Sequence, residues 1–445
     1  MLLQSDVFMF NDQLERLPRA QLQELQLKRL QEQVARVGNL VPHYGQALLA
    51  AAVKSSDIRS LADLERLPFT SKQDLRDNYP LGLLAVDNAD VQRIHASSGT
   101  RGKPTIAAYT KGDLEVWSEL VARCLAAVGV KPGDILQNAY GYGLFTGGLG
   151  LHAGAERYGA TVVPSSSGRT QQQAMLLEDL GVRVLCCTPS YALNIAATMA
   201  ESNISIDKLK LEIGIFGAEP WSAECRKQIE QNLRIKAYDI YGISEVMGPG
   251  VAVECLAQDG LHVFEDHFIF EVIDPDTKKP LPAGADGELV LTTLTKQAMP
   301  LLRYRTGDVC SIIEMPCDCG RTSRRISRIQ GRMDDMLIVR GVNVYPSEIE
   351  SVLYTIPELS PQYQIVVDRV QTLDQLKVRA ELATHCQSRW AADESSELKR
   401  RQLQTRIASV LQERLGLTAV IEILDANTLP RSEGKAHHVL DMRPR

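Results

Sequence analysis

A run of hydroxyl, glycine and basic residues between positions 97 and 104 is the sharpest chemical signal in the sequence. It reads Ser97-Ser98-Gly99-Thr100-Arg101-Gly102-Lys103-Pro104. Backbone N–H groups in such a loop can converge on a phosphate, while the hydroxyls add donors and Lys103 adds positive charge. The loop lacks the GxxxxGK[ST] spacing of the ordinary P-loop, because Pro104 follows the lysine. On its own, the octapeptide fits a flexible surface turn as well as a phosphate-binding loop.

Two further segments combine aromatic residues with glycine. Residues 140–148 read YGYGLFTGG, in which glycines permit close backbone approach while Tyr140 and Phe145 supply flat apolar walls. Residues 238–245 read YDIYGISE, where an aromatic ring can stack on a purine and Glu245 can hold Mg²⁺ beside phosphates. Taken singly, the first segment also fits tight packing of a helix start on a sheet, and the glutamate fits a solvated loop.

These segments need a scaffold, and the hydrophobic pattern between residues 90 and 245 predicts one. Short apolar runs alternate there with amphipathic stretches. Strands separated by helices of roughly 10–15 residues are typical of a parallel sheet with helices on its faces. The expected strands are Ile135–Tyr140, Thr161–Pro164, Val182–Cys187 and Leu211–Phe216, and the expected helices are Asp113–Val128, Arg169–Leu180, Tyr191–Glu201 and Ala223–Leu233.

The sequence changes character twice beyond this region. Strand-like runs between Pro and Gly turns, including Val309–Ile313, predict a β-rich subdomain over about residues 250–330. After Gly331, short strands, a long amphipathic helix through Leu403 and Leu415, and the strand Ala419–Leu424 predict a small α+β domain. We therefore expect an α/β protein with a large N-terminal domain over residues 1–333 and a small C-terminal domain over residues 334–445.

Composition excludes several classes of protein. The chain has 49 Lys+Arg against 55 Asp+Glu, a net charge of −6, with 44% hydrophobic and 23% charged residues, as in soluble globular proteins. The mildly acidic balance gives no reason to expect nucleic acid or an anionic membrane as partner. There is no apolar run of about 18 residues and no basic-then-apolar leader, so we expect a cytoplasmic protein.

The nine cysteines read as reduced thiols or metal ligands rather than as a disulfide framework. Cys317-Asp318-Cys319-Gly320 is a knuckle-like turn able to present two thiolates to one metal ion. Cys255 and His262 would bring the ligands to four, the number that structural Zn²⁺ requires. Because the spacing from Cys255 to His262 is not a common finger spacing, four separate residues remain the alternative. The other cysteines are expected to be buried small residues: Cys124, Cys186, Cys187, Cys225, Cys310 and Cys386.

Three more motifs follow in order, namely YRTGD at residues 304–308, GRMDD at 331–335 and PRSEGK at 430–435. The six motifs in this order resemble the adenylate-forming superfamily, which includes acyl-CoA synthetases, peptide-synthetase adenylation domains and luciferases. Within it, the sequence is similar to the phenylacetate–CoA ligase family from about Leu14 to the C-terminus. The motifs that carry this similarity are LPFT at 67–70, NYP at 78–80, YGLFTGG at 142–148, TPSY at 188–191 and RGVNVYP at 340–346.

The resemblance implies ATP-dependent activation of an aromatic acid, phenylacetate or a related aryl acid, to an acyl-adenylate. Transfer to the thiol of coenzyme A would then release AMP. Because the first step joins two anions, it needs charge neutralisation and alignment more than a general base. Two alternatives stay open: loading of a carrier-protein thiol, and a non-catalytic nucleotide-binding protein on the same fold. The resemblance also implies Mg²⁺ and a homodimer, which is common among relatives.

The resemblance also assigns roles to particular residues. The phosphate-binding set is Ser97, Ser98, Gly99, Thr100, Gly102 and Lys103, and the set framing the adenine is Gly217, Ala218, Glu219, Pro220, Asp239, Tyr241 and Gly242, with Tyr241 stacking. Glu245 would hold Mg²⁺, Asp308 would accept hydrogen bonds from the ribose hydroxyls, and Arg332 would contact the nucleotide. The expected acyl pocket is Tyr140, Phe145, Gly217, Ala218 and Ile240.

Lys435 is the residue expected to join the two reactants. Its ammonium would bridge the substrate carboxylate and the α-phosphate. Because it belongs to the C-terminal domain, it must leave before the thiol can enter. The resemblance therefore implies a mobile C-terminal lid that rotates about a hinge at Asp334.

Overall fold

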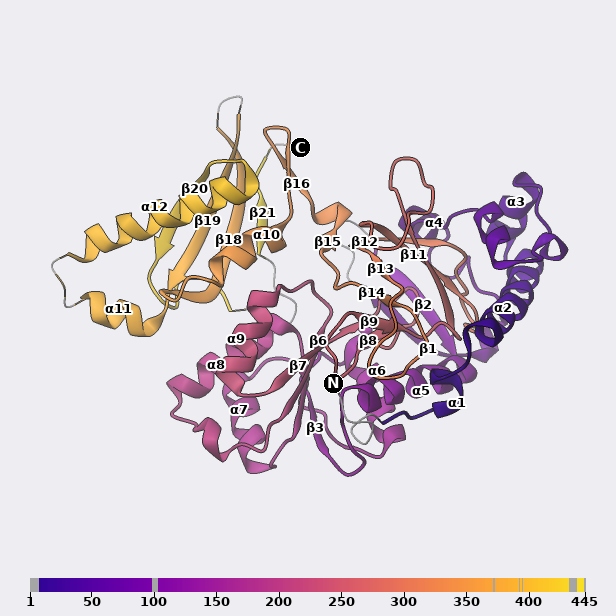
Figure 1. The fold of residues 1–445 in the computed structure, drawn as a ribbon, viewed down its shortest axis with the longest axis horizontal. Coiled ribbons are helices and arrows are strands. Elements are labelled where there is room, and N and C mark those ends of the chain that lie inside the picture. The colour runs from indigo at the N-terminus through magenta and orange to yellow at the C-terminus, as the bar shows by residue number, and fades with distance from the viewer. Residues whose placement is uncertain are drawn as a thin grey trace.

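The N-terminal region is built on a mixed β-sheet (Figure 1). The computed structural model describes residues 8–97, 103–370, 373–391, 393, 395–431 and 438–443. Within them the largest sheet has nine strands, in the order β13 (Ile312–Ile313), β14 (Arg325–Ile326), β9 (Leu261–Val263), β8 (Ala252–Glu254), β7 (Lys236–Tyr241), β6 (Ile213–Gly217), β5 (Val184–Cys187), β3 (Ile135–Asn138) and β4 (Thr161–Val163). Strands β3 to β7 run parallel, as predicted. The remaining four strands join antiparallel at one edge.

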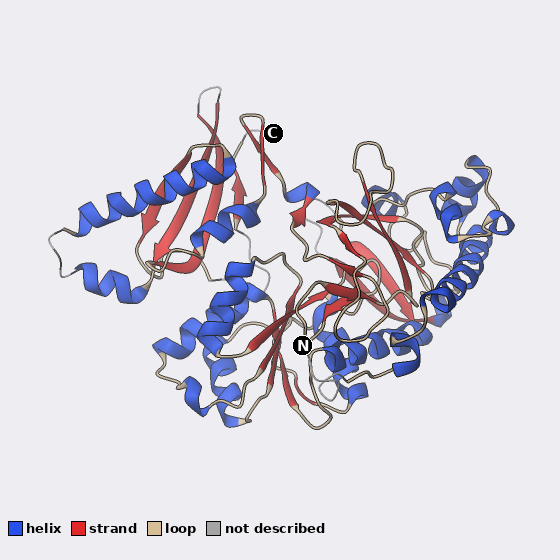
Figure 2. Cartoon of the chain, viewed as in Figure 1, coloured by secondary structure: helices blue, strands red, loops and turns tan. Residues whose placement is uncertain are grey.

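Helices cover both faces of the parallel strands. They are α5 (Lys111–Ala127), α6 (Thr146–Tyr158), α7 (Thr170–Asp179), α8 (Pro189–Glu201) and α9 (Ala223–Leu233). The labels of Figure 1 place α7, α8 and α9 on one side of these strands and α5 and α6 on the other, and Figure 2 shows the same helices in blue around the strands in red. Side-chain caps set several starts: the hydroxyls of Thr110, Thr188 and Ser222 accept backbone N–H groups of α5, α8 and α9.

A second sheet and a hairpin complete the N-terminal region. The antiparallel sheet has the order β10 (Phe268–Ile273), β11 (Gly287–Thr293), β12 (Tyr304–Cys310) and β15 (Gly331–Arg332), and the hairpin is β1 (Val91–Ser97) with β2 (Thr105–Thr110). The remaining helices are α1 (Asp12–Glu15), α2 (Arg19–Leu40), α3 (Pro42–Ala50) and α4 (Lys72–Asp77), with 3₁₀ turns at Ser55–Asp57, Leu61–Arg66, Asn88–Asp90, Ile206–Lys208 and Met333–Asp335. The hairpin flanks residues 98–102, which lie outside the described residues.

The expected β-rich segment is present but is divided between two sheets. Strands β10, β11, β12 and β15 form the antiparallel sheet, whereas β8, β9, β13 and β14 extend the large one. The single strand expected over Val309–Ile313 is therefore wrong. The strand is interrupted at Ser311, and β12 and β13 on either side of this residue pair with strands of different sheets. Alternation of residue types does not show which sheet a strand joins.

The C-terminal region has the α+β character that the sequence predicts. Its elements are β16 (Leu337–Val339), β17 (Val342–Val344), α10 (Pro346–Leu353), β18 (Leu359–Val370), β19 (Leu373–Leu382), α11 (Thr384–Ala391), α12 (Ser396–Leu415), β20 (Ala419–Leu424) and β21 (Val439–Asp441). Strands β16 and β17 form a hairpin, and the others form a sheet in the order β20-β19-β18-β21. The predicted fold class is confirmed, while the domain boundary at residue 334 and the mobility of the C-terminal region stay predictions.

Two hydrophobic clusters hold the structure together. The first lies within the N-terminal region and includes Trp117, Leu136 and Phe268. The second joins α7, α8 and α9 to the C-terminal region, since Trp221 and Cys225 belong to the same cluster as Ile349. No helix among the described residues is long and apolar enough to cross a membrane.

Candidate functional site

A cavity of roughly 520 Å³, partly open to solvent, lies at the carboxyl ends of β6 and β7. Ligands of open α/β sheets bind outside these strand ends. The lining contains all the residues expected to frame the adenine, three of the five expected in the acyl pocket, and Asp308 and Arg332. The complete lining is Gly217, Ala218, Glu219, Pro220, Asp239, Ile240, Tyr241, Gly242, Ile243, Asp308, Ile329 and Arg332.

Asp308, on β12, presents a buried carboxyl group to this cavity. The Tyr241 hydroxyl donates a hydrogen bond to its Oδ2 at 2.6 Å, and the Arg332 Nε lies 3.8 Å from its Oδ1. Burial raises the pKa of Asp308, and the positive charge of Arg332 opposes that shift without cancelling it. A buried carboxylate with acceptor positions left over suits a ligand that offers neighbouring hydroxyls.

A second buried carboxyl group, that of Asp239 on β7, also belongs to the cavity wall. Burial, and after it the neighbouring Glu254, raises the pKa of Asp239. Glu254 is itself held by Arg226 at 2.6 Å and accepts the Asp239 backbone N–H at 2.8 Å. This part of the wall is therefore a fixed polar network rather than a mobile surface.

Backbone packing at the cavity requires two of its glycines. A Cβ atom on Gly217 would lie 2.1 Å from the carbonyl oxygen of Ile240, and one on Gly242 would lie 1.7 Å from that of Gly248. Both contacts are with backbone, which cannot turn aside as a side chain would. Ala218 follows Gly217 with a φ of 71°, in the left-handed region that L-residues rarely adopt.

Glu245 lies where the chain leaves β7, next to the hairpin that flanks residues 98–102. The Ser97 hydroxyl, at the end of β1, donates to its Oε1 at 2.9 Å. The Lys103 ammonium lies over the Tyr79 ring, 4.8 Å from the centroid. Ser98, Gly99, Thr100 and Gly102 lie outside the described residues. The structure thus brings Glu245 beside the first residue of the predicted phosphate loop.

The two aromatic residues expected in the acyl pocket do not line the cavity. Tyr140 and Phe145 pack beside each other with ring centroids 6.4 Å apart, and Phe145 is 40% exposed. The Tyr140 hydroxyl is buried without a hydrogen-bond partner among the described residues. Burial raises the pKa of Tyr140 well above its ordinary value, with further contributions from nearby groups including Asp239. Tyr140 is therefore close to the cavity wall, although it does not form it.

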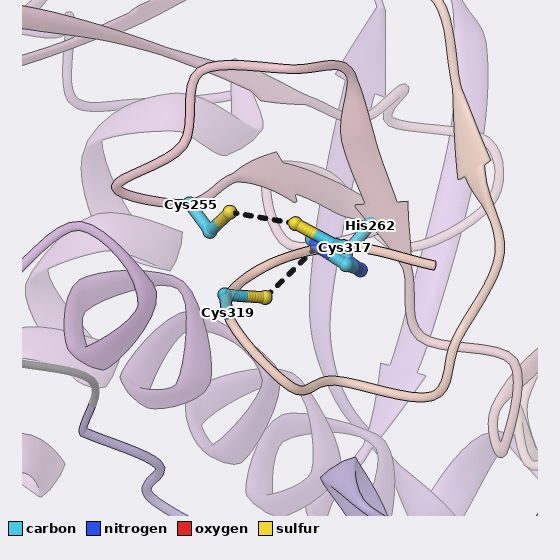
Figure 3. Close-up of side chains that lie close together, drawn as sticks. All are labelled: Cys255, His262, Cys317 and Cys319. Atoms are coloured by element: carbon cyan, nitrogen blue, oxygen red, sulfur yellow. Dashed lines mark hydrogen bonds between the residues drawn. The ribbon is translucent and has the colours of Figure 1, made fainter. Parts of the chain in front are cut away.

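Figure 3 shows the four predicted zinc ligands gathered in one place. Cys255 follows β8, His262 lies on β9, and Cys317 and Cys319 lie in the loop between β13 and β14. Their ligand atoms all lie within 4.8 Å of one another. The Cys255 and Cys317 sulfurs are 3.6 Å apart, and the Cys319 sulfur is 3.3 Å from His262 Nε2. A tetrahedral Zn²⁺ site has ligand–ligand separations of about 3.3–3.8 Å.

The surroundings of this cluster also fit a metal site. His262 Nδ1 lies 3.3 Å from the backbone carbonyl of Ser323, which leaves Nε2 directed at the thiols. Burial of three of the four residues keeps water away. The six other cysteines are buried and unpaired, as expected.

Comparisons with known proteins identify the family. Residues 25–295 match the AMP-binding enzyme family, and residues 341–443 match the AMP-binding enzyme C-terminal domain. A phenylacetate–coenzyme A ligase of Thermus thermophilus is 51% identical over 443 residues, covering 98% of this chain and 100% of that protein. The chain belongs to the phenylacetate–CoA ligase family. It is therefore an AMP-forming acid–thiol ligase of the adenylate-forming superfamily.

Solved structures relate this ligase to two states of one enzyme. A 2-hydroxyisobutyryl-CoA ligase in the postadenylation state, bound to 2-HIB-AMP, has a TM-score of 0.90 at 28% identity, covering 96% of this chain and 91% of that chain. The same enzyme with 2-HIB-AMP and CoA in the thioesterification state has a TM-score of 0.72 at 28% identity, covering 100% and 94%.

The expected hinge of the ligase lies between the two regions. Asp334 is in the 3₁₀ turn after β15, and Arg332 Nε donates to its Oδ1 at 2.9 Å. Burial acts to raise the pKa of Asp334, but the Arg332 guanidinium outweighs it and the pKa is lowered. Lys435 lies outside the described residues, so its approach to the cavity is not part of this geometry.

Sequence reasoning missed three residues near the site of the ligase. Ile243 and Ile329 line the cavity, and Lys296 contacts Glu245. Ile243 lies inside the YGISE motif, so its place next to Gly242 was a usable signal. Ile329 and Lys296 come from segments distant in sequence, and only the pairing of strands brings them close.

Proposed function

We propose that this ligase joins an aryl acid, phenylacetate or a close relative, to coenzyme A. The observation that carries the proposal is one cavity in which apolar Gly217, Ala218 and Ile240 adjoin the hydrogen-bonded pair Tyr241–Asp308. The name of the 51% identical relative supports the same acid class. A small apolar wall next to a diol acceptor suits an acyl group attached to a nucleotide.

We propose that the N-terminal region holds the nucleotide before reaction. The Asp308 carboxylate accepts hydrogen bonds from the ribose hydroxyls. Tyr241, held by its hydrogen bond to that carboxylate, lies against the adenine. Glu245 holds Mg²⁺, for which its buried carboxylate is a suitable hard oxygen ligand. When bound, the ion neutralises phosphate charge. The hydroxyl of Ser97 orients the carboxylate from the phosphate-loop side.

We propose that the C-terminal region acts as a lid that carries Lys435 to the acid and the α-phosphate. The higher TM-score with the postadenylation state than with the thioesterification state, 0.90 against 0.72, supports an adenylation-type arrangement of the two regions here. Rotation about Asp334 would then withdraw Lys435 and admit the thiol.

A panel of aromatic acids tests the proposal. Purified enzyme with ATP and Mg²⁺ is assayed for AMP release with each acid, with and without CoA. We expect release that depends on both an aryl acid and CoA. Release that needs an acyl-carrier protein in place of CoA would support the alternative acceptor. The absence of acid-dependent AMP and pyrophosphate with every acid would contradict the proposal.

We also propose that Cys255, His262, Cys317 and Cys319 hold a structural Zn²⁺. The ion would tie the end of β8 and the strand β9 to the loop between β13 and β14. Metal analysis should find close to one zinc per chain, lost in Cys319→Ser together with a lower melting temperature. Cys386→Ser, at a buried cysteine outside the cluster, is the matched control and should keep its zinc. Zinc far below one per chain in the wild type would contradict the site.

We further propose that the enzyme works as a homodimer in the cytoplasm. Nine free cysteines are compatible with a reducing compartment. The dimer rests on the family resemblance alone. Sedimentation equilibrium that gives the mass of a single chain at all concentrations would contradict it.

A further inference from the structure

Lys296 is a buried lysine whose ammonium lies against the backbone of Glu245. It comes from the loop between β11 and β12 and is 1% exposed. Its Nζ donates to the carbonyl oxygen of Glu245 at 3.0 Å and lies 4.4 Å from the centroid of the Tyr109 ring. The carboxylates that act on its charge, Asp113 and Glu245, form no direct ion pair with it in the described part of the chain.

The loop that carries Lys296 is fixed on both sides of the residue. The carboxylate of Asp113 accepts the backbone N–H groups of Gln297 at 2.6 Å and Ala298 at 3.0 Å. The Lys296 carbonyl oxygen accepts the side chain of Gln33 at 2.7 Å. Burial of an ammonium group costs free energy, and an apolar side chain could fill the same space. We therefore expect the positive charge of Lys296 to have a function.

The segment that Lys296 contacts is held by a second buried donor. The Tyr109 hydroxyl donates to the carbonyl oxygen of Ser244 at 2.9 Å. Tyr109 lies on β2 and Ser97 ends β1, so both strands of the hairpin around residues 98–102 bond to this segment. Two consecutive carbonyl groups, those of Ser244 and Glu245, are thus each bound by a side chain from another part of the fold.

We propose that Lys296 is a positioning residue for the metal–nucleotide site. Its ammonium holds the Glu245 peptide, and together with Tyr109 it keeps the Glu245 carboxylate beside Ser97. A ligand group fixed before the nucleotide arrives loses no reorganisation energy when it binds. The inference rests on the metal-binding role of Glu245 in the proposed function.

The test compares Lys296→Met, which keeps the length but removes the charge, with Lys296→Arg, which keeps the charge. For Lys296→Met we expect the KM for ATP and the Mg²⁺ concentration at half-maximal rate to rise roughly tenfold, the lower end for loss of a charged donor. The KM for the aryl acid should change less than about twofold, since Lys296 does not reach the acyl wall. Lys296→Arg should recover part of the loss.

Tyr109→Phe is a second variant, and it removes no buried charge. It deletes only the donor to Ser244 and should raise the same two constants by a smaller factor, even where Lys296→Met folds poorly. Lys131→Met, at an exposed lysine in the turn before β3, is the matched control and should behave as the wild type. Melting temperatures of all variants separate loss of folding from loss of positioning.

Two results would overturn the inference. One is a folded Lys296→Met with wild-type ATP and Mg²⁺ dependence. The other is an equal rise in the constants for ATP, Mg²⁺ and acid, which indicates general damage. Calorimetric binding of Mg–ATP to each variant needs no acid substrate. It therefore tests the role of Lys296 separately from the proposed function. The proposed function fails only if the wild type forms no AMP from any aryl acid.

Discussion

Among single side chains, Asp308 gives the clearest prediction of how nucleotide binding depends on pH. Burial raises its pKa, so acidification protonates it earlier than an exposed aspartate. A protonated carboxyl group offers fewer acceptors to the ribose hydroxyls, and nucleotide binding should weaken as pH falls through the raised pKa. We expect Asp308→Asn to raise the KM for ATP roughly tenfold at neutral pH, as for loss of a charged hydrogen bond.

The measurement is the KM for ATP from pH 5 to 8 in both proteins. The wild-type value should climb on the acid side, whereas the Asp308→Asn value should stay flat because the amide does not titrate. Tyr241→Phe removes the donor at 2.6 Å but leaves the carboxylate, so its acid limb should remain and move to higher pH, because that hydrogen bond lowers the pKa of Asp308. An acid limb of equal size in Asp308→Asn would show that another group controls binding.

Gly217 lies where the backbone leaves no room for a side chain. An added Cβ would lie 2.1 Å from the Ile240 carbonyl oxygen, so Gly217→Ala must separate the ends of β6 and β7. We expect a loss of several kcal/mol of stability, in the range of strongly overpacked sites, and weak acid binding. Gly284→Ala is the control: its φ is 84° but no atom lies within 4 Å, and it should cost only about 1 kcal/mol. Urea denaturation of both variants compares the two costs.

The residues of the cavity show what the sequence could predict about the site. Ten lining positions were named from motifs, because short motifs keep neighbouring residues together: Gly217, Ala218, Glu219, Pro220, Asp239, Ile240, Tyr241, Gly242, Asp308 and Arg332. The bond from Tyr241 to Asp308 was not predictable, since 67 residues separate them. Tyr140 and Phe145, expected in the acyl pocket because they are aromatic, do not line this cavity, and their role beside the acyl group stays a prediction.

Among the elements, helices were predicted more accurately than the membership of strands in sheets. The helix expected over Ala223–Leu233 coincides with α9, because the period of its apolar residues and the cap at Ser222 are local signals. Strands β13 and β14 join the large sheet through the pairing of β14 with β9, in which Arg325 lies opposite the distant His262. The residue pattern of a single strand does not identify its pairing partner. For this reason the sequence predicted a β-rich subdomain separate from the large sheet.

The contact between α10 and α9 gives a prediction at the level of elements. Glu350 on α10 accepts the Tyr363 hydroxyl at 2.9 Å and the backbone N–H of Ser222, the cap of α9, at 3.3 Å. Burial, with the neighbouring charge of Glu219, raises the pKa of Glu350 to about 7. Contact between the regions therefore favours the protonated form and should weaken as pH rises from the ordinary glutamate pKa through about 7.

Glu350→Gln stays neutral and should keep the regions in contact above pH 7. We expect its thioester-forming step to slow relative to the wild type between pH 7 and 8.5, while adenylation is little changed. Separate rates for pyrophosphate exchange and for acyl transfer from preformed adenylate give the comparison. Glu413→Gln, at an exposed position of α12, is the control. Identical pH profiles for Glu350→Gln and the wild type would rule out the role of this carboxyl.

At the scale of the whole molecule, the two-step reaction predicts a separation of functions. Asp334→Pro restricts the backbone at the expected hinge and should slow thioester formation at least tenfold, with adenylation nearly intact. Lys435→Ala should do the opposite: ATP still binds, but pyrophosphate exchange nearly stops. Both half-reactions are measured in each variant. Equal loss of both steps in Asp334→Pro would argue against a hinge at this residue.

The hydrophobic cluster shared by the two regions has a consequence for solubility. Trp221 and Cys225 on one side and Ile349 and Val352 on the other are buried in the same cluster. A chain cut at residue 333 would leave the N-terminal half of this cluster facing water, which favours aggregation. The C-terminal region thus covers apolar surface of the N-terminal region, and the proposed rotation about Asp334 would expose that surface to water.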